Sequence, residues 1–296
     1  MSRRFDRKRI ETLVGVLSPA RLTRIVDVGA NPVNASPYRK LLAAGLCDVW
    51  GFEPDARSFA ELTQTAHETY LNHAVGDGSR GTLHLTRGPA LTSLFRPDPA
   101  AVALFQRFGD VLEVERELEV ETRALDAMEE LPEFDLLKID VQGAEVMVYE
   151  GARGHLDRAV AVISEVGFVP LYEGQPLLDA QMVALRARGM DLHKFMFAKP
   201  VALRGGLAGK LDQRAHANQL LDGDAVFLRS LRSPEAMTDE QLKHMAILAD
   251  AVFESHDVAV RCLDLLIARG VVDRRAAKAY VGQVPDLAGA AKAAGG

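Results

Sequence analysis

The sequence predicts an α/β fold: a doubly wound, seven-stranded, mostly parallel sheet followed by a C-terminal helical extension. Short runs rich in Val, Ile and Leu alternate with helical patterns, which is typical of strands in a parallel sheet. Beyond residue 230 these runs stop, and apolar residues recur only at helical spacing. The chain has 296 residues. Since a usual domain has roughly 100–200 residues, we expect one large domain with an appendage.

The strands of the predicted sheet are short apolar runs along the first 230 residues. They are expected at Arg24–Val28, Asp48–Phe52, Thr69–Val75, Phe134–Ile139, Ala159–Val166, Asp191–Phe197 and Asp224–Ser230. A further segment, Glu115–Thr122, alternates glutamates with mostly apolar residues, as an edge or hairpin strand does. We expect this segment to pair with Gly81–Thr86.

The predicted helical extension covers residues 231–296, after a main domain at residues 1–230. Thr238 and Gln241 have the spacing of a capping box at the start of a helix. Apolar residues then recur at helical spacing, first to Phe253 and again from Val258 to Gly270. The sequence does not decide whether these helices cover the sheet, form a homodimer face or bind a substrate.

Composition and charge exclude several classes of function. The net charge of −6 argues against nucleic acid and anionic membranes as partners, because both attract clustered Lys and Arg, so a small molecule or glycan fits better. The two cysteines, Cys47 and Cys262, form no pairing pattern and suit a reducing cytoplasm. The eight histidines lack metal-binding spacing, so no metal is expected. No apolar stretch reaches the roughly 18 residues of a membrane span.

Two strand ends together predict a site for a nucleoside. The first strand ends in Asp27-Val28-Gly29-Ala30-Asn31, and in an open parallel sheet the ligand lies beyond such ends. The second ends in Gly51-Phe52-Glu53-Pro54, which places a carboxylate where ribose hydroxyls can donate to it. Either feature alone is ordinary in a turn or strand end. The G-x-G-x-x-G pattern of dinucleotide sites fails at Asn31 and Asn34, which favours S-adenosylmethionine.

The third feature is the block from Leu136 to Glu145. Lys138 and Asp140 are two residues apart near the end of a strand that otherwise reads as buried, so both lie on one face. Buried charges need partners. One interpretation is a structural ion pair of Lys138 with Glu145 or Glu165. The other is that the cluster borders the reacting methyl group, since it lies on the strand next to the cofactor strand.

On these residues the chain resembles the FkbM family of S-adenosylmethionine-dependent methyltransferases, over about residues 22–200. The matching pieces are Asp27–Asn31, Gly51–Pro54, Ala74–Asp77, Leu125-Asp126, Leu137–Glu145, Glu165 and Pro170–Tyr172. The Lys-Ile-Asp and Gly-Ala-Glu parts of the block are the most specific. The resemblance implies a class I, Rossmann-like methyltransferase fold and O-methylation of a hydroxyl on a polyketide, sugar or glycan.

The resemblance also implies roles for individual residues. Those assigned to S-adenosylmethionine are Asp27, Gly29, Ala30 and Asn31 around its methionine end, Glu53 at the ribose, Asn72 and Ala74 beside the adenine, and Asp140 beneath the sulfonium. Two positions depart from the family. Relatives often have glycine in place of Val33, and Gln142 stands where they commonly have glutamate, so it cannot act as a base.

An alcohol acceptor needs a base, because its proton must leave during methyl transfer. The candidate carboxylates are Asp140, Glu145 and Glu165, and Glu165 is the predicted base. Lys138 can orient one of them or polarise the acceptor oxygen. The segments Thr92–Phe95 and Tyr172–Gln175 are expected as loops over the cleft, although their polar groups can also serve only as turn-formers.

Two other functions stay open at this point. The first is a non-catalytic module that binds S-adenosylmethionine but has lost turnover, in view of Gln142 and Val33. The second is a nicotinamide-dependent oxidoreductase on a similar sheet, which the failed glycine pattern disfavours.

Overall fold

The computed structural model describes residues 6–30, 36–105 and 108–284, which fall into two compact units. The larger unit comprises the described residues within Arg24–Ala35 and Asp48–Leu231. The smaller comprises those within Met1–Thr23, Ser36–Cys47 and Arg232–Gly296. The N-terminal segment thus belongs to the same unit as the C-terminal helices. The boundary near residue 230, inferred from the end of the strand pattern, stays a prediction.

The larger unit is built on the seven-stranded sheet that the sequence predicts. Its strands, in spatial order, are β3 (Glu68–Leu71), β2 (Cys47–Phe52), β1 (Thr23–Val28), β6 (Leu136–Ile139), β7 (Ala161–Gly167), β9 (Gln219–Arg229) and β8 (Met190–Val201). The prediction that the sheet is mostly parallel is confirmed: β1–β6, β2–β3 and β6–β7 are parallel pairs, whereas β9 is antiparallel to both β7 and β8.

The order of the strands decides where a ligand can bind. From β1 the chain winds outward to β2 and β3, and then returns to β6 on the other side of β1. The carboxyl ends of β1 and β6 therefore form the topological switch point, where open α/β sheets bind their ligands. Because β9 runs in the opposite direction, its first residues lie at the edge where the parallel strands end.

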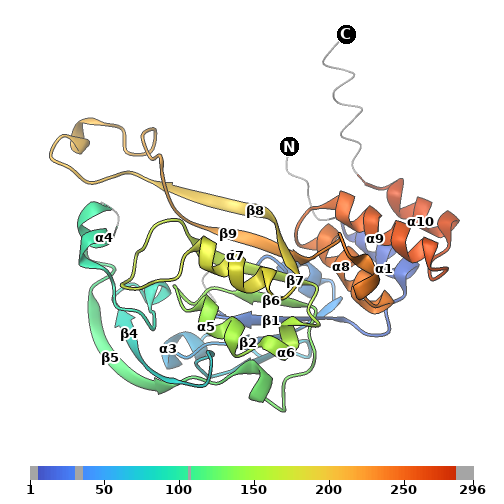
Figure 1. Cartoon of the computed structure of the whole chain (residues 1–296), viewed down its shortest axis with the longest axis horizontal. Helices are drawn as coiled ribbons and strands as arrows, with labels where there is room; N and C mark the ends of the chain where they lie inside the picture. The colour runs from blue at the N-terminus through green and yellow to red at the C-terminus, as the bar shows by residue number, and fades with distance from the viewer. Residues whose placement is uncertain (1–5, 31–35, 106–107, 285–296) are drawn as a thin grey trace, which may run out of the picture. The chain divides into compact units, whose positions relative to one another are not determined.

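Helices and short turns connect the strands of the larger unit. Figure 1 shows α5 (Glu145–Glu150), α6 (Arg153–Leu156) and α7 (Leu178–Arg186) in front of the sheet. The other elements of this unit are α3 (Ala56–Phe59), α4 (Pro99–Leu104), η1 (Pro89–Leu91), η2 (Leu125–Ala127) and η3 (Ala208–Lys210). Apolar residues of α5, α6 and α7 pack with the sheet in one core that includes Val148, Leu156 and Leu185.

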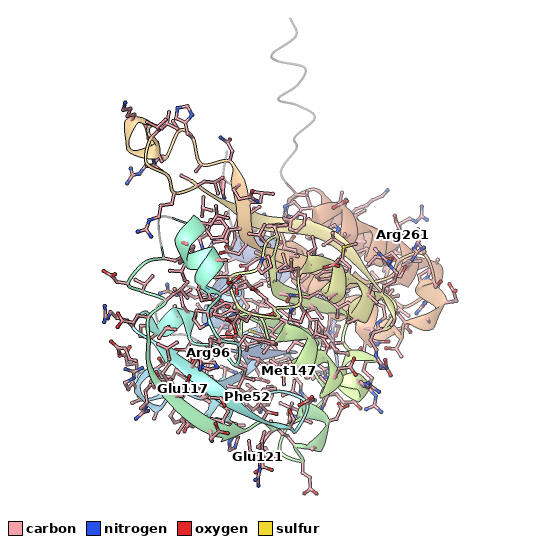
Figure 2. All side chains as sticks on the ribbon, turned by 60° about the vertical axis from the view of Figure 1, so that its left-hand side comes forward. Phe52, Arg96, Glu117, Glu121, Met147 and Arg261 are labelled. Carbon is pink, nitrogen blue, oxygen red and sulfur yellow. The ribbon has the colours of Figure 1, made fainter. Side chains whose placement is uncertain are left out.

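A separate two-stranded ribbon pairs the two segments that the sequence predicts. Strand β4 (Arg80–Thr86) is antiparallel to β5 (Val114–Glu121). The expected apolar face of β5 is less buried than the alternation suggests: Leu118, on that face, is 42% exposed. The ribbon carries ion pairs instead: Arg96 lies beside Glu117, as Figure 2 shows. In Figure 1, β8 and β9 continue as a long hairpin past the rest of the sheet.

The smaller unit is helical, as the sequence predicts for its C-terminal part. Its elements are α1 (Arg7–Leu17), α2 (Arg39–Ala43), η4 (Pro234–Ala236), α8 (Asp239–Ala251), α9 (His256–Ala268) and α10 (Arg274–Val281). The capping box is confirmed: Thr238 and Gln241 each accept a hydrogen bond from the other's backbone N–H. Homodimer formation through these helices stays a prediction. Among the described residues, no helix has the length and apolarity that a membrane span needs.

Candidate active site

The ends of three neighbouring strands are tied together at the switch point. The backbone N–H groups of Gly29 and Ala30 both donate to the carbonyl of Phe52, at 2.9 and 3.0 Å. The N–H of Asp140 donates to the carbonyl of Val28 at 3.0 Å. The structure thus brings the Asp27–Ala30, Glu53 and Lys138–Glu145 segments to one edge of the sheet, as the sequence predicts.

Gly29 is required by this close approach. Its φ is +82°, a conformation that residues with a Cβ rarely adopt. A Cβ at this position would also overlap the carbonyl oxygen of Asp140. Glycine therefore lets the loop after β1 turn directly against the loop after β6.

Lys138 pairs with Asp27 across the switch point. Its Nζ atom lies 3.1 Å from Oδ1 of Asp27 and 3.4 Å from the carbonyl oxygen of Gly29. Burial opposes the charged form of Lys138, but the carboxylates of Asp27 and Asp140 outweigh it and raise its pKa. The interpretation that Lys138 pairs with Glu145 or Glu165 is therefore wrong. The parallel register places Asp27 directly opposite Lys138, whereas Glu145 turns back to its own loop.

Glu53 ends β2 with a mostly buried carboxylate. Its Oε1 accepts a 2.8 Å hydrogen bond from the N–H of Asp55, and no described residue donates to Oε2. Burial raises the pKa of Glu53 to about 7, because little water is left to solvate its charge. A partly unsatisfied carboxylate next to the first strand is a suitable acceptor for hydroxyl donors of a ligand.

Asn72 and Ala74, the residues expected beside the adenine, follow β3. The side-chain amide of Asn72 donates to the carbonyl oxygens of Glu53, at 2.7 Å, and of Pro54, at 3.1 Å. The carbonyl of Ala74 accepts a 2.8 Å hydrogen bond from the N–H of Arg123. Asn72 thus holds the Glu53 loop, and a role of either residue at the adenine stays a prediction. Asn31, Pro32 and Val33 lie outside the described residues.

Glu145 lies at the start of α5 and is bound to the loop that precedes it. Its Oε1 accepts hydrogen bonds from the N–H groups of Val141 and Gly143, both at 3.2 Å. Burial raises its pKa to about 7 despite these bonds. The contacts give Glu145 a role in shaping the loop between β6 and α5.

Gln142 joins the two carboxylates that flank the carboxyl ends of β6 and β7. Its Nε2 donates to Oδ1 of Asp140 at 2.8 Å and to Oε2 of Glu165 at 2.7 Å. The hydroxyl of Tyr172 lies 3.0 Å from Oε1 of Gln142, and Oγ of Ser93 donates to its carbonyl at 2.7 Å. Both segments expected as loops over the cleft therefore do reach the site.

Glu165 lies on β7, in the most acidic part of the site. Burial, followed by the carboxylates of Asp140 and Glu145, raises its pKa well above the usual value for glutamate. Asp224 lies directly opposite Glu165 on β9, and burial together with Asp140 raises the pKa of Asp224 to about 6. A carboxyl group whose pKa is raised in this way has the proton affinity of a general base at neutral pH.

Three residues of the site, Tyr172, Ser93 and Asp224, were not predicted as site residues from the sequence. Tyr172 and Ser93 lie in the two loop segments, where their polar groups read equally well as turn-formers. Asp224 is the first residue of a strand predicted from its apolar residues. The antiparallel direction of β9 brings Asp224 to the edge of the sheet where the parallel strands end. Within the described parts of the chain, no group of three or more His, Cys, Asp and Glu side chains could hold a metal ion.

A comparison with protein families decides the assignment. A model described as the methyltransferase FkbM domain matches residues 27–192, more than half of the chain. The chain belongs to the FkbM methyltransferase family. It is thus an S-adenosylmethionine-dependent methyltransferase by family, as the sequence motifs predict. No curated protein sequence matches the chain.

Several solved structures are similar to this FkbM-family chain at low identity. A methyltransferase FkbM from Methylobacillus flagellatus KT is 13% identical with a TM-score of 0.37, and the match covers 70% of this chain but only 43% of that one. The magnesium protoporphyrin IX methyltransferase of Synechocystis PCC 6803, solved with bound SAM, is 11% identical over 76% and 79% of the two chains, with a TM-score of 0.35.

A third similar structure is Sp1610 from Streptococcus pneumoniae, described as a putative tRNA (m1A22) methyltransferase. It is 12% identical over 95% of this chain and 90% of that one, with a TM-score of 0.34.

The residues present fit S-adenosylmethionine. Oε2 of Glu53 receives no hydrogen bond from the described residues and can accept one from a ribose hydroxyl. The carboxylates of Asp27, Asp140 and Glu165 give the switch point an acidic character, which favours a cationic sulfonium electrostatically. These features agree with the cofactor that the family uses.

Proposed function

We propose that this FkbM-family chain transfers the methyl group of S-adenosylmethionine to a hydroxyl group of a sugar, glycan or small metabolite, with Glu165 as the general base. The observation that carries the proposal is the position of Glu165. It lies on β7, the strand next to the switch-point strand β6, in contact with the side chain that holds Asp140.

The chemistry of an alcohol acceptor explains why such a base is needed. When bound, S-adenosylmethionine supplies an electrophilic methyl group. An alcohol becomes a good nucleophile only as its proton leaves, and a carboxylate of raised pKa can receive that proton. No described residue donates a hydrogen bond to Oε1 of Glu165, so this oxygen is available to the acceptor hydroxyl.

The other site residues have supporting roles in the proposal. Glu53 binds the ribose hydroxyls, and Asp27 with Gly29 shapes the loop around the methionine end of the cofactor. The ammonium of Lys138 pairs with Asp27 at 3.1 Å. Its positive charge partly balances the negative charges of Asp27 and Asp140. Positioning of the acceptor in line with the methyl group accounts for most of the expected rate acceleration.

The acceptor class is supported by the charge of the chain. A net charge of −6 and an acidic site both disfavour a polyanionic acceptor, because like charges repel. An uncharged polyhydroxylated compound can instead donate hydrogen bonds to the carboxylates at the edge of the sheet.

The test of this proposal is to find the methylated product. The full chain is incubated with a cell extract and isotope-labelled S-adenosylmethionine, and mass spectrometry identifies compounds that gain the label. Glu165→Gln is expected to lose at least about a hundredfold in turnover, the usual contribution of a general base, while it still binds S-adenosylhomocysteine. Glu173→Gln, which removes an exposed carboxylate in the Tyr172 loop, is the matched control.

Two outcomes would contradict the proposal. Full activity of Glu165→Gln across the pH range would show that Glu165 is not the base. Cofactor binding without label transfer to any compound would favour a non-catalytic binding module.

A further inference from the structure

One side-chain amide at the site donates hydrogen bonds to two carboxylates. The two N–H groups of the Gln142 amide reach Oδ1 of Asp140 and Oε2 of Glu165, at 2.8 and 2.7 Å. Both oxygens are therefore acceptors in these bonds. Hydrogen bonds to the charged form of a carboxyl group favour that form.

The two carboxylates set the direction in which the Gln142 amide points, and the hydroxyl of Tyr172 lies beside the amide oxygen. Burial, followed by the nearby carboxylate of Glu165, raises the pKa of the Tyr172 hydroxyl, so it stays protonated and has one hydrogen to donate. Its possible acceptors are Oε1 of Gln142 and the carbonyl of Leu91, each at 3.0 Å. The opposite orientation of the amide would place Oε1 of Gln142 against two carboxylate oxygens, which is repulsive.

The backbone of Gln142 is held in a conformation unusual for its residue type. Its φ is +56°, and Gly143 follows at +108°. Such conformations are strained outside glycine and persist where the surroundings enforce them. Here Oγ of Ser93 donates to the Gln142 carbonyl at 2.7 Å, and Gln142 itself is buried. The side chain therefore has little freedom to leave the two carboxylates.

The surrounding charges make a neutral side chain at this position important. Glu165 faces the carboxylates of Asp140, Glu145, Asp222 and Asp224. The cations among these groups are already paired: Lys138 with Asp27, at 3.1 Å, and Lys199 with Asp222, at 2.7 Å. The Gln142 amide is then the hydrogen-bond donor that separates Asp140 from Glu165. A glutamate of the same shape would add a third negative charge.

We propose that Gln142 is a positioning residue: it holds Asp140 and Glu165 as acceptors of one amide and leaves Oε1 of Glu165 to receive the proton of the acceptor hydroxyl. This inference rests on the proposed function, in which Glu165 is the base. Gln142 itself transfers no proton.

The test measures proton binding directly and needs no acceptor. The full chain, labelled with ¹³C at the Asp and Glu carboxyl groups, is titrated by NMR, and Asp140→Asn and Glu165→Gln identify the two signals. The isosteric change Gln142→Glu is expected to raise the upper apparent pKa of the pair by at least about one unit. Gln142→Met, which keeps the length but has no donor, is expected to raise it as well. Gln64→Glu, an exposed change of equal charge, is the control and is expected to leave it unchanged.

The wild-type chain provides a second measurement that does not depend on any variant folding. The ¹⁵N and ¹H signals of the Gln142 side-chain amide are expected to shift with the same midpoint as the carboxyl pair. The inference would be overturned if Gln142→Glu left the pKa values of the Asp140–Glu165 pair unchanged. It would also be overturned if the Gln142 amide signals did not shift as the pair titrates. Calorimetry with S-adenosylhomocysteine on the same samples separates this outcome from a failure of the proposed function, since loss of cofactor binding in the wild type would contradict that function instead.

Discussion

The ammonium of Lys138 lies 3.1 Å from the carboxylate of Asp27, and this pair joins strands β6 and β1 where they end at the candidate site. Both side chains are largely buried, at 15% and 2% exposed. Ions in such surroundings are stable only with partners, because the protein interior solvates them poorly. The pair therefore links two of the segments that form the candidate site.

Replacement of Lys138 by methionine is expected to destabilise the chain by about 3–5 kcal/mol, because it leaves the buried carboxylate of Asp27 without its cation. The double variant Asp27→Asn with Lys138→Met removes both charges and is expected to recover much of this loss. Urea unfolding, followed by the fluorescence of Trp50 on β2, measures both effects. A loss below about 1 kcal/mol in the single variant, typical of exposed pairs, would contradict this account.

Cofactor binding is expected to depend on pH through Glu53. In the proposed function, ribose hydroxyls donate to the ionised carboxylate of Glu53, and burial raises the pKa of this group to about 7. Affinity for S-adenosylhomocysteine should therefore be highest above pH 7 and fall as the pH drops below it, by up to about tenfold per pH unit. Isothermal titration calorimetry between pH 5.5 and 8.5 measures the dependence.

The variant Glu53→Gln is expected to bind about 10- to 100-fold more weakly at pH 8, because it loses charge-assisted hydrogen bonds, and to show no such pH dependence. Glu61→Gln, a loss of an exposed carboxylate in the same segment, is the control. If Glu53→Gln kept the slope of the wild type, another group would be responsible for it.

The fold was largely predictable because its signals are local. Strand runs such as Arg24–Val28 and the capping box at Thr238 depend on neighbouring residues only, and the structure has both. The strand expected at Thr69–Val75 is shorter, ending at Leu71, because the segment after it turns to make an isolated bridge between Val75 and Arg123.

The candidate site was less predictable, because its contacts join segments far apart in the chain. The spacing of Lys138 and Asp140 indicated buried charges, but only the register of β6 against β1 shows that the partner is Asp27. The hydrogen bond from Gln142 to Glu165 joins residues 23 positions apart, and Gln142 has a positive φ that its residue type does not indicate. Asp224 joins the site because β9 is antiparallel.

Gly29 is expected to tolerate no side chain. In Gly29→Ala the new Cβ would overlap the carbonyl oxygen of Asp140, and the φ of +82° would be strained as well. We expect S-adenosylhomocysteine binding to be lost and the larger unit to be destabilised by at least about 1–2 kcal/mol. Gly45→Ala is the control, since Gly45 has φ of +69° but no atom within reach of a Cβ. Equal effects in the two variants would show that backbone strain alone, and not the approach of Asp140, is responsible.

A buried ion pair is expected to make the helical unit sensitive to acid. The guanidinium of Arg9 on α1 donates to both oxygens of Asp250 on α8, at 2.8 and 2.9 Å, and the hydroxyl of Tyr280 donates to the same carboxylate at 2.6 Å. Burial alone would raise the pKa of Asp250, but hydrogen bonds from His256, Arg9 and Tyr280 outweigh it and lower the pKa to about 2. Because the folded pKa is below the ordinary value, the stabilisation is complete above about pH 4 and is lost as the pH falls toward 2.

The variant Asp250→Asn is therefore expected to lose about 3–5 kcal/mol at pH 7, because Arg9 stays buried without a counter-charge. Its difference from the wild type should shrink as the pH falls from 4 to 2, where the wild-type carboxylate also becomes neutral. Hydrogen exchange of peptides from α1 and α8, measured by mass spectrometry, reports the helical unit by itself. The exposed pair of Arg7 and Glu11 supplies the control, since Glu11→Gln should change stability by less than about 1 kcal/mol at any pH. A constant difference between Asp250→Asn and the wild type down to pH 2 would mean that the charge of Asp250 does not stabilise these helices.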